Sequence, residues 1–367
     1  MEIRRIDVYP VAYTNATGPL VLSGGRVSTG QEGTLVRVET DDGLVGWGES
    51  TVIAPDYLPG YAPATQAVLP LLARALLGAD PRQVETTYAR LEAAAKGYEP
   101  AKSALDTACW DLFGRATGLR LADLLGGVRQ DEVPLYTVVG IAEPEAMRER
   151  ALAAAADGYR SVQLKLGTSV AEDVARVEAL LPALGHVERV ILDANAYWPL
   201  ADARRVGAAA ARFDVYLEQP CATLEECAAV RAGSRLPLVL DESLHSVGDL
   251  VRAHARGAAD AVRLKLARFG GITPVRRARD LAVELGLPLT IEDAGGGDVV
   301  SAALLHLACS VPPKLLLAGY LPSELNVERV ATGTPVAASG HARLPQAAGL
   351  GVEVDESALG PRVARIE

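Results

Sequence analysis

The sequence predicts an α/β protein in which a TIM-like (β/α)₈ barrel follows an N-terminal α+β capping domain that the C-terminal segment completes. Two observations lead to this fold class. From about residue 133, short β-rich runs alternate eight times with Ala-rich helical stretches, the pattern of a parallel sheet with crossover helices. The charged residues that follow these runs are spaced 23 to 28 residues apart, enough for one strand, one helix and two short loops.

Residues 1–126 are predicted to form the capping domain. It opens with a strand, and "TLVRVETDDGLVGWGES" is expected to be a β-hairpin because Asp42–Gly43 is a strong turn signal between two β-rich runs. Three helices follow, marked by Pro at the start or Gly at the end. Two irregular segments rich in Gly, Pro, Ser and Thr are predicted to be lid loops, near residues 14–30 and 50–61.

The barrel is assigned to residues 127–325. Its eight predicted strands are, in chain order, "VPLYTVVG", "SVQLKLG", "RVILDAN", "DVYLEQP", "LPLVLDES", "AVRLKLA", "LPLTIEDAG" and "KLLLAGYL". Residues 326–367 fit neither a barrel strand nor a terminal helix, so we expect them to return to the capping domain.

The composition argues against several classes of protein. The 367 residues are 49% hydrophobic and carry a net charge of −10 without basic clusters, which argues against a nucleic-acid partner. No segment approaches the roughly 20 apolar residues of a membrane-spanning helix, and the start lacks the apolar core of a signal peptide. The four cysteines form no C-x-x-C pair, which favours reduced thiols in a cytoplasmic protein.

Acidic residues follow three consecutive predicted barrel strands: Asp193, Glu218 and Asp241. Because the carboxyl ends of the strands form the active-site mouth of such a barrel, we expect these three carboxylates to share one arc of it. Three oxygen ligands without His or Cys favour a hard cation, predicted to be one Mg²⁺ per subunit. Without a cation, carboxylates this close would repel one another.

Lys165 and Lys265 follow the second and sixth strands and therefore face each other across the mouth. A nearby Mg²⁺ and a second lysine predict a lowered lysine pKa, so that one amine can act as a base. The layout suits abstraction of the proton alpha to a carboxylate, giving a metal-stabilised enediolate, while the other lysine returns or donates a proton. A Schiff-base aldolase and a non-catalytic barrel that binds a small acid are alternatives, which the three acids and the intact lysine pair disfavour.

Six further residues are predicted to contact the substrate: Gln163, Asn195, Tyr57, Tyr320, Glu292 and Asp293. The acidic pair Glu292–Asp293 follows the seventh strand and could hold a substrate ammonium or pair with Lys265, and both interpretations stay open. Gln163 shares a strand face with Lys165, and Asn195 is placed to support the metal ligands. "AGGGD", residues 294–298, matches no nucleotide-binding pattern and is interpreted as close backbone approach by a ligand or loop, or as a tight turn.

At these residues the chain resembles the enolase superfamily, in its mandelate racemase and muconate lactonizing enzyme branch. "LDAN", "LEQP" and "LDES" are similar to the three metal-ligand motifs, and "LKLG" and "RLKLARFGG" to the two lysine strands. "ACWDLFGRATG" and "GWGES" are similar to capping-domain markers, so the resemblance runs essentially end to end. It implies a Mg²⁺-dependent enzyme that acts on a small-molecule carboxylate, and a homo-oligomer is expected.

One departure narrows the resemblance. The muconate lactonizing subgroup usually has Lys-x-Lys on the second strand, and here Gln163 replaces the first lysine, which argues against a muconate cycloisomerase or a succinylbenzoate synthase. "LVLSGGR", "LEQPCATLEECAAV", "LDESLH" and "IEDAGG" are more similar to cis-3-hydroxy-L-proline dehydratases and hydroxyproline-betaine epimerases, which implies a proline-type amino acid as substrate. The betaine epimerases tend to have Trp where Gly295 stands, so dehydration is favoured over racemisation or epimerisation of proline or hydroxyproline derivatives.

Overall fold

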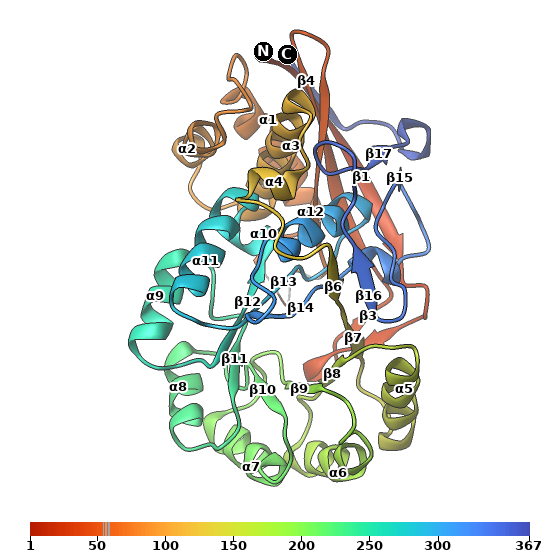
Figure 1. Cartoon of the computed structure of the whole chain (residues 1–367), viewed down its shortest axis with the longest axis vertical. Coiled ribbons are helices and arrows are strands. Elements are labelled where there is room, and N and C mark those ends of the chain that lie inside the picture. Colours follow the sequence, from red (N-terminus) through yellow and green to blue (C-terminus); the bar gives the residue numbers. More distant parts are fainter. Residues whose placement is uncertain (54, 56, 58) are drawn as a thin grey trace.

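The computed structural model describes every residue of the chain except 54, 56 and 58. Eight parallel strands follow one another around a barrel in chain order (Figure 1). They are β7 (Tyr136–Val139), β8 (Ser161–Lys165), β9 (Arg189–Asp193), β10 (Tyr216–Glu218), β11 (Leu238–Leu240), β12 (Ala261–Lys265), β13 (Leu289–Glu292) and β14 (Leu316–Ala318). A parallel bridge between Leu135 and Gly319 joins the first strand to the last, so the predicted barrel is confirmed.

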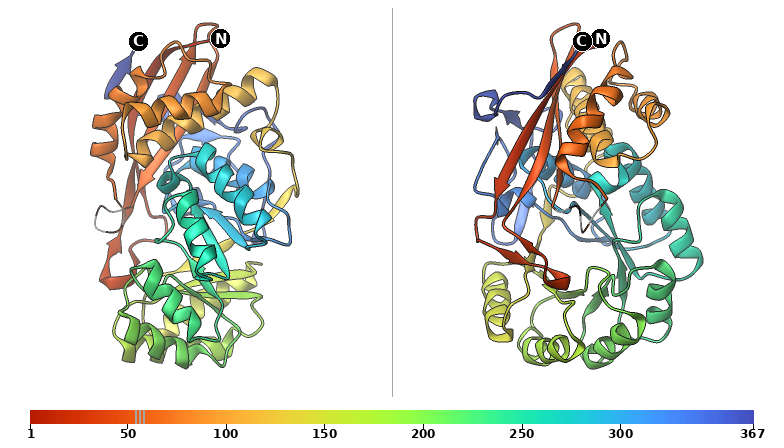
Figure 2. Two further views of the ribbon diagram at one scale, coloured as in Figure 1. Left: turned by 90° about the vertical axis from the view of Figure 1, so that its left-hand side faces the viewer. Right: turned by 180° about the vertical axis from the view of Figure 1, so that it is seen from behind.

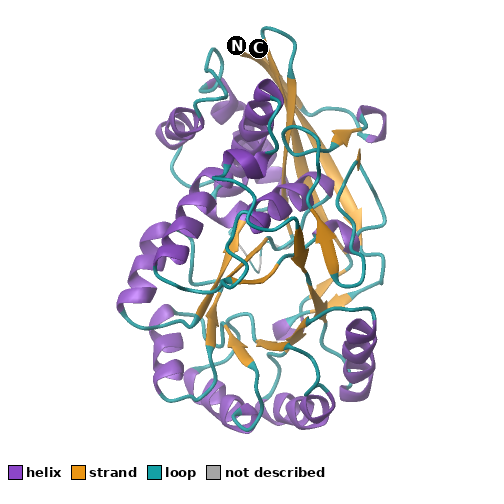
Figure 3. Ribbon diagram, in the orientation of Figure 1, coloured by secondary structure: helices purple, strands orange, loops and turns teal. Residues whose placement is uncertain are grey.

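Helices connect the strands and cover the outside of the barrel (Figure 3). They are α5 (Pro144–Ala156), α6 (Val170–Leu180), α7 (Leu200–Ala210), α8 (Leu224–Ala232), α9 (Val247–Ala255), α10 (Leu266–Phe269), α11 (Ile272–Glu284) and α12 (Asp298–Cys309). Ser169 caps the N-terminus of α6 and Thr223 that of α8, each in a capping box with a glutamate three residues further along the chain. Within the described residues, none of the helices has the length and apolar character that crossing a membrane requires.

The capping sheet is antiparallel and holds four strands in the order β18, β1, β4, β5. Their bounds are β1 (Ile3–Thr14), β4 (Gly30–Thr40), β5 (Val45–Val52) and β18 (Ala364–Ile366). The predicted hairpin is β4–β5, and Gly43 adopts the positive φ of 86° that its turn needs. Because Ile366 pairs with Ile6, the last strand lies beside the first, and both ends of the chain meet at one pole of the molecule (Figures 1 and 2).

The three predicted helices of the capping domain are present. They are α1 (Ala62–Arg74), α2 (Val84–Ala94) and α3 (Glu99–Thr117), followed by the short α4 (Leu121–Leu124). Buried side chains of α1, α2 and α3 pack with buried side chains of β1 and β4 in a core separate from that of the barrel. Gly118 ends α3 in the left-handed conformation, as the Gly at the end of the predicted helix indicates.

Some segments differ from their predictions. The first predicted strand, residues 133–140, is split because neighbouring backbone N–H groups have different partners: Leu135 donates to Gly340, and Tyr136 donates to Gly319. Before the split, β6 (Glu132–Pro134) pairs with β16 (His341–Arg343), so part of the C-terminal segment lies at the N-terminal end of the first barrel strand. Two short pairs complete the fold: β2 (Leu20–Val21) with β3 (Val27–Ser28), and β15 (Ala331–Thr332) with β17 (Glu353–Val354).

Two buried carboxylates fasten the capping domain to the barrel. Glu49 of β5 accepts hydrogen bonds from the backbone N–H groups of Gly297 (2.7 Å) and Val300 (3.0 Å), at the start of α12. Asp106 of α3 accepts from the backbone N–H (2.8 Å) and hydroxyl (2.7 Å) of Thr273, at the start of α11. The N–H groups at a helix N-terminus have no partner within the helix and favour an anion. Each carboxylate therefore accepts hydrogen bonds from such N–H groups, Glu49 at α12 and Asp106 at α11, and both helices follow strands whose ends form the active-site mouth.

The glycine cluster at residues 294–298 is explained by this contact. A Cβ atom on Gly297 would lie 2.2 Å from Oη of Tyr13 and 2.7 Å from Oε1 of Glu49. The cluster is therefore a close backbone approach by the capping domain, one of the interpretations that the sequence allows.

His306 of α12 gives a stability prediction. It is fully buried; Nδ1 accepts from the backbone N–H of Ala122 (3.1 Å), and Nε2 therefore carries the proton toward the carbonyl of Leu350 (3.0 Å). Burial lowers the pKa of His306 from 6.5 to about 4, because a charged imidazole would lose solvation and the Ala122 contact. A depressed pKa contributes stability that is present above pH 6.5 and is lost as the pH falls toward 4.

We therefore expect His306→Gln, which keeps one acceptor and one donor but does not titrate, to flatten the pH dependence of stability. Between pH 7.5 and 4.5 the wild type should lose about 2 to 3 kcal/mol more unfolding free energy than the variant, measured by urea titration. Parallel curves for the two proteins would show that protonation of His306 does not weaken the fold.

Candidate active site

The predicted charged ring lies at the carboxyl ends of the barrel strands. Five of its members are the last residues of their strands: Lys165, Asp193, Glu218, Lys265 and Glu292. Asp241 directly follows β11, and all six side chains are buried. The register pairs Lys165 with Asp193, Asp193 with Glu218, and Lys265 with Glu292, so these groups stand at one level around the barrel.

The predicted metal ligands divide into a converging pair and a separately held third residue. The amide nitrogen Nε2 of Gln163 donates to Asp193 Oδ2 (2.9 Å) and lies 3.1 and 3.0 Å from the two oxygens of Glu218. Asp241 instead contacts Arg268 Nη2 (2.6 Å) and Lys265 Nζ (2.7 Å). As these side chains stand, no group of three or more His, Cys, Asp or Glu in the described part of the chain is arranged to hold a metal ion.

The chemistry of these donors nevertheless fits a hard divalent cation. Asp193 and Glu218 already direct three carboxylate oxygens toward one nitrogen atom, and carboxylate oxygen is the ligand that Mg²⁺ prefers. Burial raises the pKa of Glu218 well above its usual range, and the charges of Asp193 and Asp241 raise it further, against the opposing effect of Arg263. A cation between these carboxylates would relieve that repulsion.

The two lysines line one cavity from opposite sides of the barrel. Lys165 Nζ lies 2.5 Å from Asp193 Oδ2, while Lys265 Nζ lies 2.7 Å from Asp241 Oδ2 and 3.5 Å from Glu292 Oε1. Burial alone would lower the pKa of Lys265, but the charges of Asp241 and Glu292 raise it. The lowering that the sequence predicts refers to a site that holds Mg²⁺ and stays a prediction; the nearest charges of Lys265 among the protein side chains are carboxylates.

All six predicted substrate contacts line the same cavity. The remaining lining residues include Leu20, Leu22, Ile53 and Val138, so the cavity has an apolar side. Tyr320 stacks on Tyr136 with ring centroids 4.9 Å apart.

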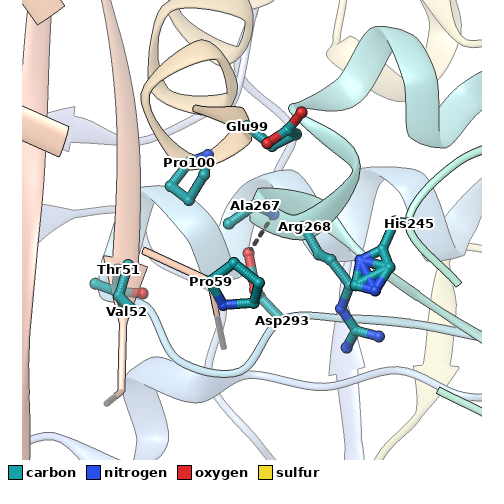
Figure 4. A pocket seen from close by; sticks show the side chains of 9 residues that line it. All are labelled: Thr51, Val52, Pro59, Glu99, Pro100, His245, Ala267, Arg268 and Asp293. Carbon is teal, nitrogen blue, oxygen red and sulfur yellow. Dashed lines mark hydrogen bonds between the residues drawn. The ribbon is translucent and has the colours of Figure 1, made fainter. Parts of the chain in front are cut away.

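The acidic pair on β13 has two environments. Glu292 accepts from the hydroxyl of Tyr136 and from Arg263, and lies near Lys265, so the structure favours its interpretation as a partner of Lys265. Among the described residues, Asp293 accepts hydrogen bonds from the backbone N–H groups of Ala267 (2.7 Å) and Ala294 (2.8 Å), and burial raises the pKa of Asp293 to about 7. A second cavity of about 170 Å³ lies on its other side, next to Arg268 and His245 (Figure 4).

Asn195 and Tyr57 connect the barrel to the two irregular segments of the capping domain. Asn195 Nδ2 donates to Asp193 Oδ2 (3.0 Å) and to the hydroxyl of Tyr57 (3.1 Å), and its Oδ1 accepts from Ser23 (3.0 Å). Tyr57 donates to Glu242 (2.6 Å), and its hydroxyl lies 3.4 Å from Lys265 Nζ. Tyr57 of segment 50–61 thus contacts the carboxylate of Glu242 directly, whereas Ser23 of segment 14–30 is connected to Asp193 through Asn195.

Sequence reasoning missed two arginines of the site, Arg263 and Arg268. Arg263 lies two residues before Lys265, and strand alternation, the signal that places Gln163 beside Lys165, would have found it. Arg268 stands in the one-turn helix α10, where no strand periodicity applies, and its contact with Asp241 depends on the fold.

Comparisons with known proteins add to this geometry. Residues 5–126 match the family model of the mandelate racemase / muconate lactonizing enzyme, N-terminal domain, and residues 146–358 match one described as enolase C-terminal domain-like. A cis-3-hydroxy-L-proline dehydratase from Roseibium aggregatum is 38% identical over 365 residues, which cover 100% of both chains. An N-succinyl-L-Arg/Lys racemase from Bacillus cereus is 30% identical over 371 residues, which cover 98% of this chain and 97% of the other.

Solved structures resemble the whole chain as well. The crystal structure of a member of the enolase superfamily from Roseovarius nubinhibens ISM, complexed with magnesium, has a TM-score of 0.94 and 36% identity. The match covers 100% of this chain and 99% of that one. The barrel, its charged mouth and these full-length matches have one explanation: the chain is an enzyme of the enolase superfamily and belongs to its mandelate racemase/muconate lactonizing enzyme branch.

Proposed function

We propose that the enzyme dehydrates cis-3-hydroxy-L-proline or a close relative. The observation that carries this proposal is the pair of lysines that faces one small cavity from the second and sixth strands, with three acids on the arc between them. The 38% identical relative from Roseibium aggregatum is named for this reaction, which supports the choice of substrate.

In the proposed reaction, one lysine removes the α-proton of the substrate and the other, protonated, gives a proton to the departing 3-hydroxyl. Glu292 and Asp241 keep the amine of Lys265 in place, and Asp193 does so for Lys165. Asp293 faces the cavity and would accept a hydrogen bond from the substrate ammonium. Magnesium held by Asp193, Glu218 and Asp241 would supply positive charge where the substrate carboxylate gains electron density.

Gly295 supports a free amino acid rather than a betaine as substrate. A Cβ atom on Gly295 would lie 1.7 Å from Oε1 of Gln31. Gln31 is held in place, because Gly296 donates to its Oε1 (3.0 Å) and its amide donates to Asn326 (2.9 Å). An aromatic ring that could cover a quaternary ammonium therefore has no space at this position.

The second candidate is a two-base racemase or epimerase of proline or hydroxyproline derivatives. The opposed lysines favour it, since amines on two sides of one substrate can remove and return a proton on opposite faces. The 30% identical relative named as a racemase is consistent with this alternative.

Proton NMR in D₂O with Mg²⁺ separates the two reactions. Loss of the 3-hydroxyl with formation of a cyclic imine means elimination, whereas deuterium at Cα on an unchanged skeleton means epimerisation. A panel of free and N-methylated proline derivatives that neither loses water nor exchanges its α-proton would contradict both assignments.

A further inference from the structure

Arg263 is a charged side chain at the centre of the barrel. It is 0% exposed, and it stands on β12 on the same inward face as Lys265. Its Nε lies 2.7 Å from Oε1 of Glu218, and its Nη1 donates to Oε2 of Glu292. One guanidinium therefore connects the fourth strand to the seventh.

This arrangement is costly for a residue that only supports the fold. A buried ion loses several kcal/mol of solvation, and replacing buried ion pairs by apolar side chains is often neutral or stabilising. Nε and Nη2 of Arg263 make no hydrogen bond within the part of the chain that the structure describes, so its contact with Glu218 is an ion pair. A core selected for stability alone would more readily contain an apolar side chain here, so the guanidinium points to a role in the site.

The contacts of Arg263 join the two halves of the site. Glu218 belongs to the converging carboxylate pair, and Arg263 is the only Lys, Arg or His of the described residues that forms a salt bridge with it. Glu292 lies 3.5 Å from Lys265, so its position affects where that amine stands. Gln163, the other neighbour of Glu218, is neutral and cannot supply the charge.

We propose that Arg263 is a positioning residue that holds Glu218 and Glu292 in fixed relation, and thereby aligns the carboxylate arc with Lys265. The inference rests on the proposed function, because it assigns Glu218 to a cation and Lys265 to the reaction. It depends on the fork of arginine: two nitrogens of one planar group reach two acids, whereas the single nitrogen of lysine reaches one.

The test uses Arg263→Lys, which keeps the charge. Its control is Arg189→Lys, the same substitution at the opposite end of the barrel, where Arg189 donates to the carbonyl of Leu317. We expect R263K to reduce kcat by about 10- to 100-fold with little change in KM, since small misplacements of reacting groups cost that much. Its Kd for Mg²⁺, measured by calorimetry without substrate, should rise at least about fivefold. R189K should stay within about twofold of the wild type in both measurements.

A double-mutant cycle tests the connection to Lys265. If Arg263 acts through Glu292, R263K combined with Glu292→Gln should lose little more activity than the worse single variant. Losses that multiply would overturn that connection, and a wild-type Kd for Mg²⁺ in R263K would overturn the connection to Glu218. A lowered unfolding midpoint with kcat and Kd both unchanged would leave Arg263 a structural residue only.

The proposed function and this inference fail in different ways. Calorimetry needs no turnover, so R263K reports on Arg263 even where the wild type leaves cis-3-hydroxy-L-proline unchanged. A wild-type enzyme that leaves cis-3-hydroxy-L-proline unchanged contradicts the substrate assignment alone.

Discussion

Lys165→Ala and Lys265→Ala will each reduce turnover of the proposed substrate by about 10³-fold, in the range typical of losing a positioned general acid or base. Both amines line the cavity, and each is buried and hydrogen-bonded to an acid of the neighbouring strand. Alanine removes the amine from its side of the cavity, and the remaining lysine lines the cavity from the opposite side. Steady-state kinetics measures the loss, and Lys96→Ala, whose side chain is 84% exposed, provides the control.

Exchange of the α-proton with D₂O then separates the roles of the two lysines. The variant that lacks the base should lose exchange and dehydration together, whereas the variant that lacks the acid should still exchange the α-proton while water loss falls. Wild-type turnover in either variant would remove the two-lysine mechanism.

Chelation is expected to have an effect of similar size. Dialysis against EDTA should reduce activity by at least about 10³-fold, and added Mg²⁺ should restore it, because the charge that develops on the substrate carboxylate would otherwise meet Asp193, Glu218 and Asp241 directly. Activity that persists without divalent ions, together with borohydride trapping of a substrate on a lysine, would favour the Schiff-base alternative.

Metal binding also has a readout that is independent of turnover. A ligand that binds only the folded state raises the unfolding temperature, so Mg²⁺ should raise that of the wild type. Glu218→Gln keeps the shape of the side chain but removes one ligand charge, and the shift should largely vanish. Glu178→Gln, an exposed position on α6, should keep it. Equal shifts in all three proteins would place the cation elsewhere.

The sequence was sufficient to predict the residues that end strands. In a parallel barrel all strands run in the same direction, so a charged residue directly after an apolar run lies at the active-site mouth. Lys165, Asp193, Glu218, Lys265 and Glu292 all follow this rule, and the structure finds each at the end of its strand.

Contacts between segments that lie far apart in the chain could not be predicted from the sequence. Nothing in "AGGGD" indicates that Glu49, some 250 residues earlier, accepts a hydrogen bond from Gly297 at the start of α12. The position of Gln31 against Gly295 is equally unreadable. Asp241 and Glu292 both reach the amine of Lys265 and raise its pKa, and these contacts too depend on the fold.

The pairing of β18 with β1 affects the order in which the protein can be built. As the chain is synthesised, Ile6 is made early, and its partner Ile366 follows only after the entire barrel. Until then the outer edge of β1 has no strand beside it, and Asp7 lacks Arg365, which donates to its carboxylate at 2.7 Å. Open strand edges pair readily with other chains. A nascent chain halted between the barrel and residue 364 would therefore contain every barrel strand and still be prone to aggregate, because β18 has not yet paired with the edge of β1.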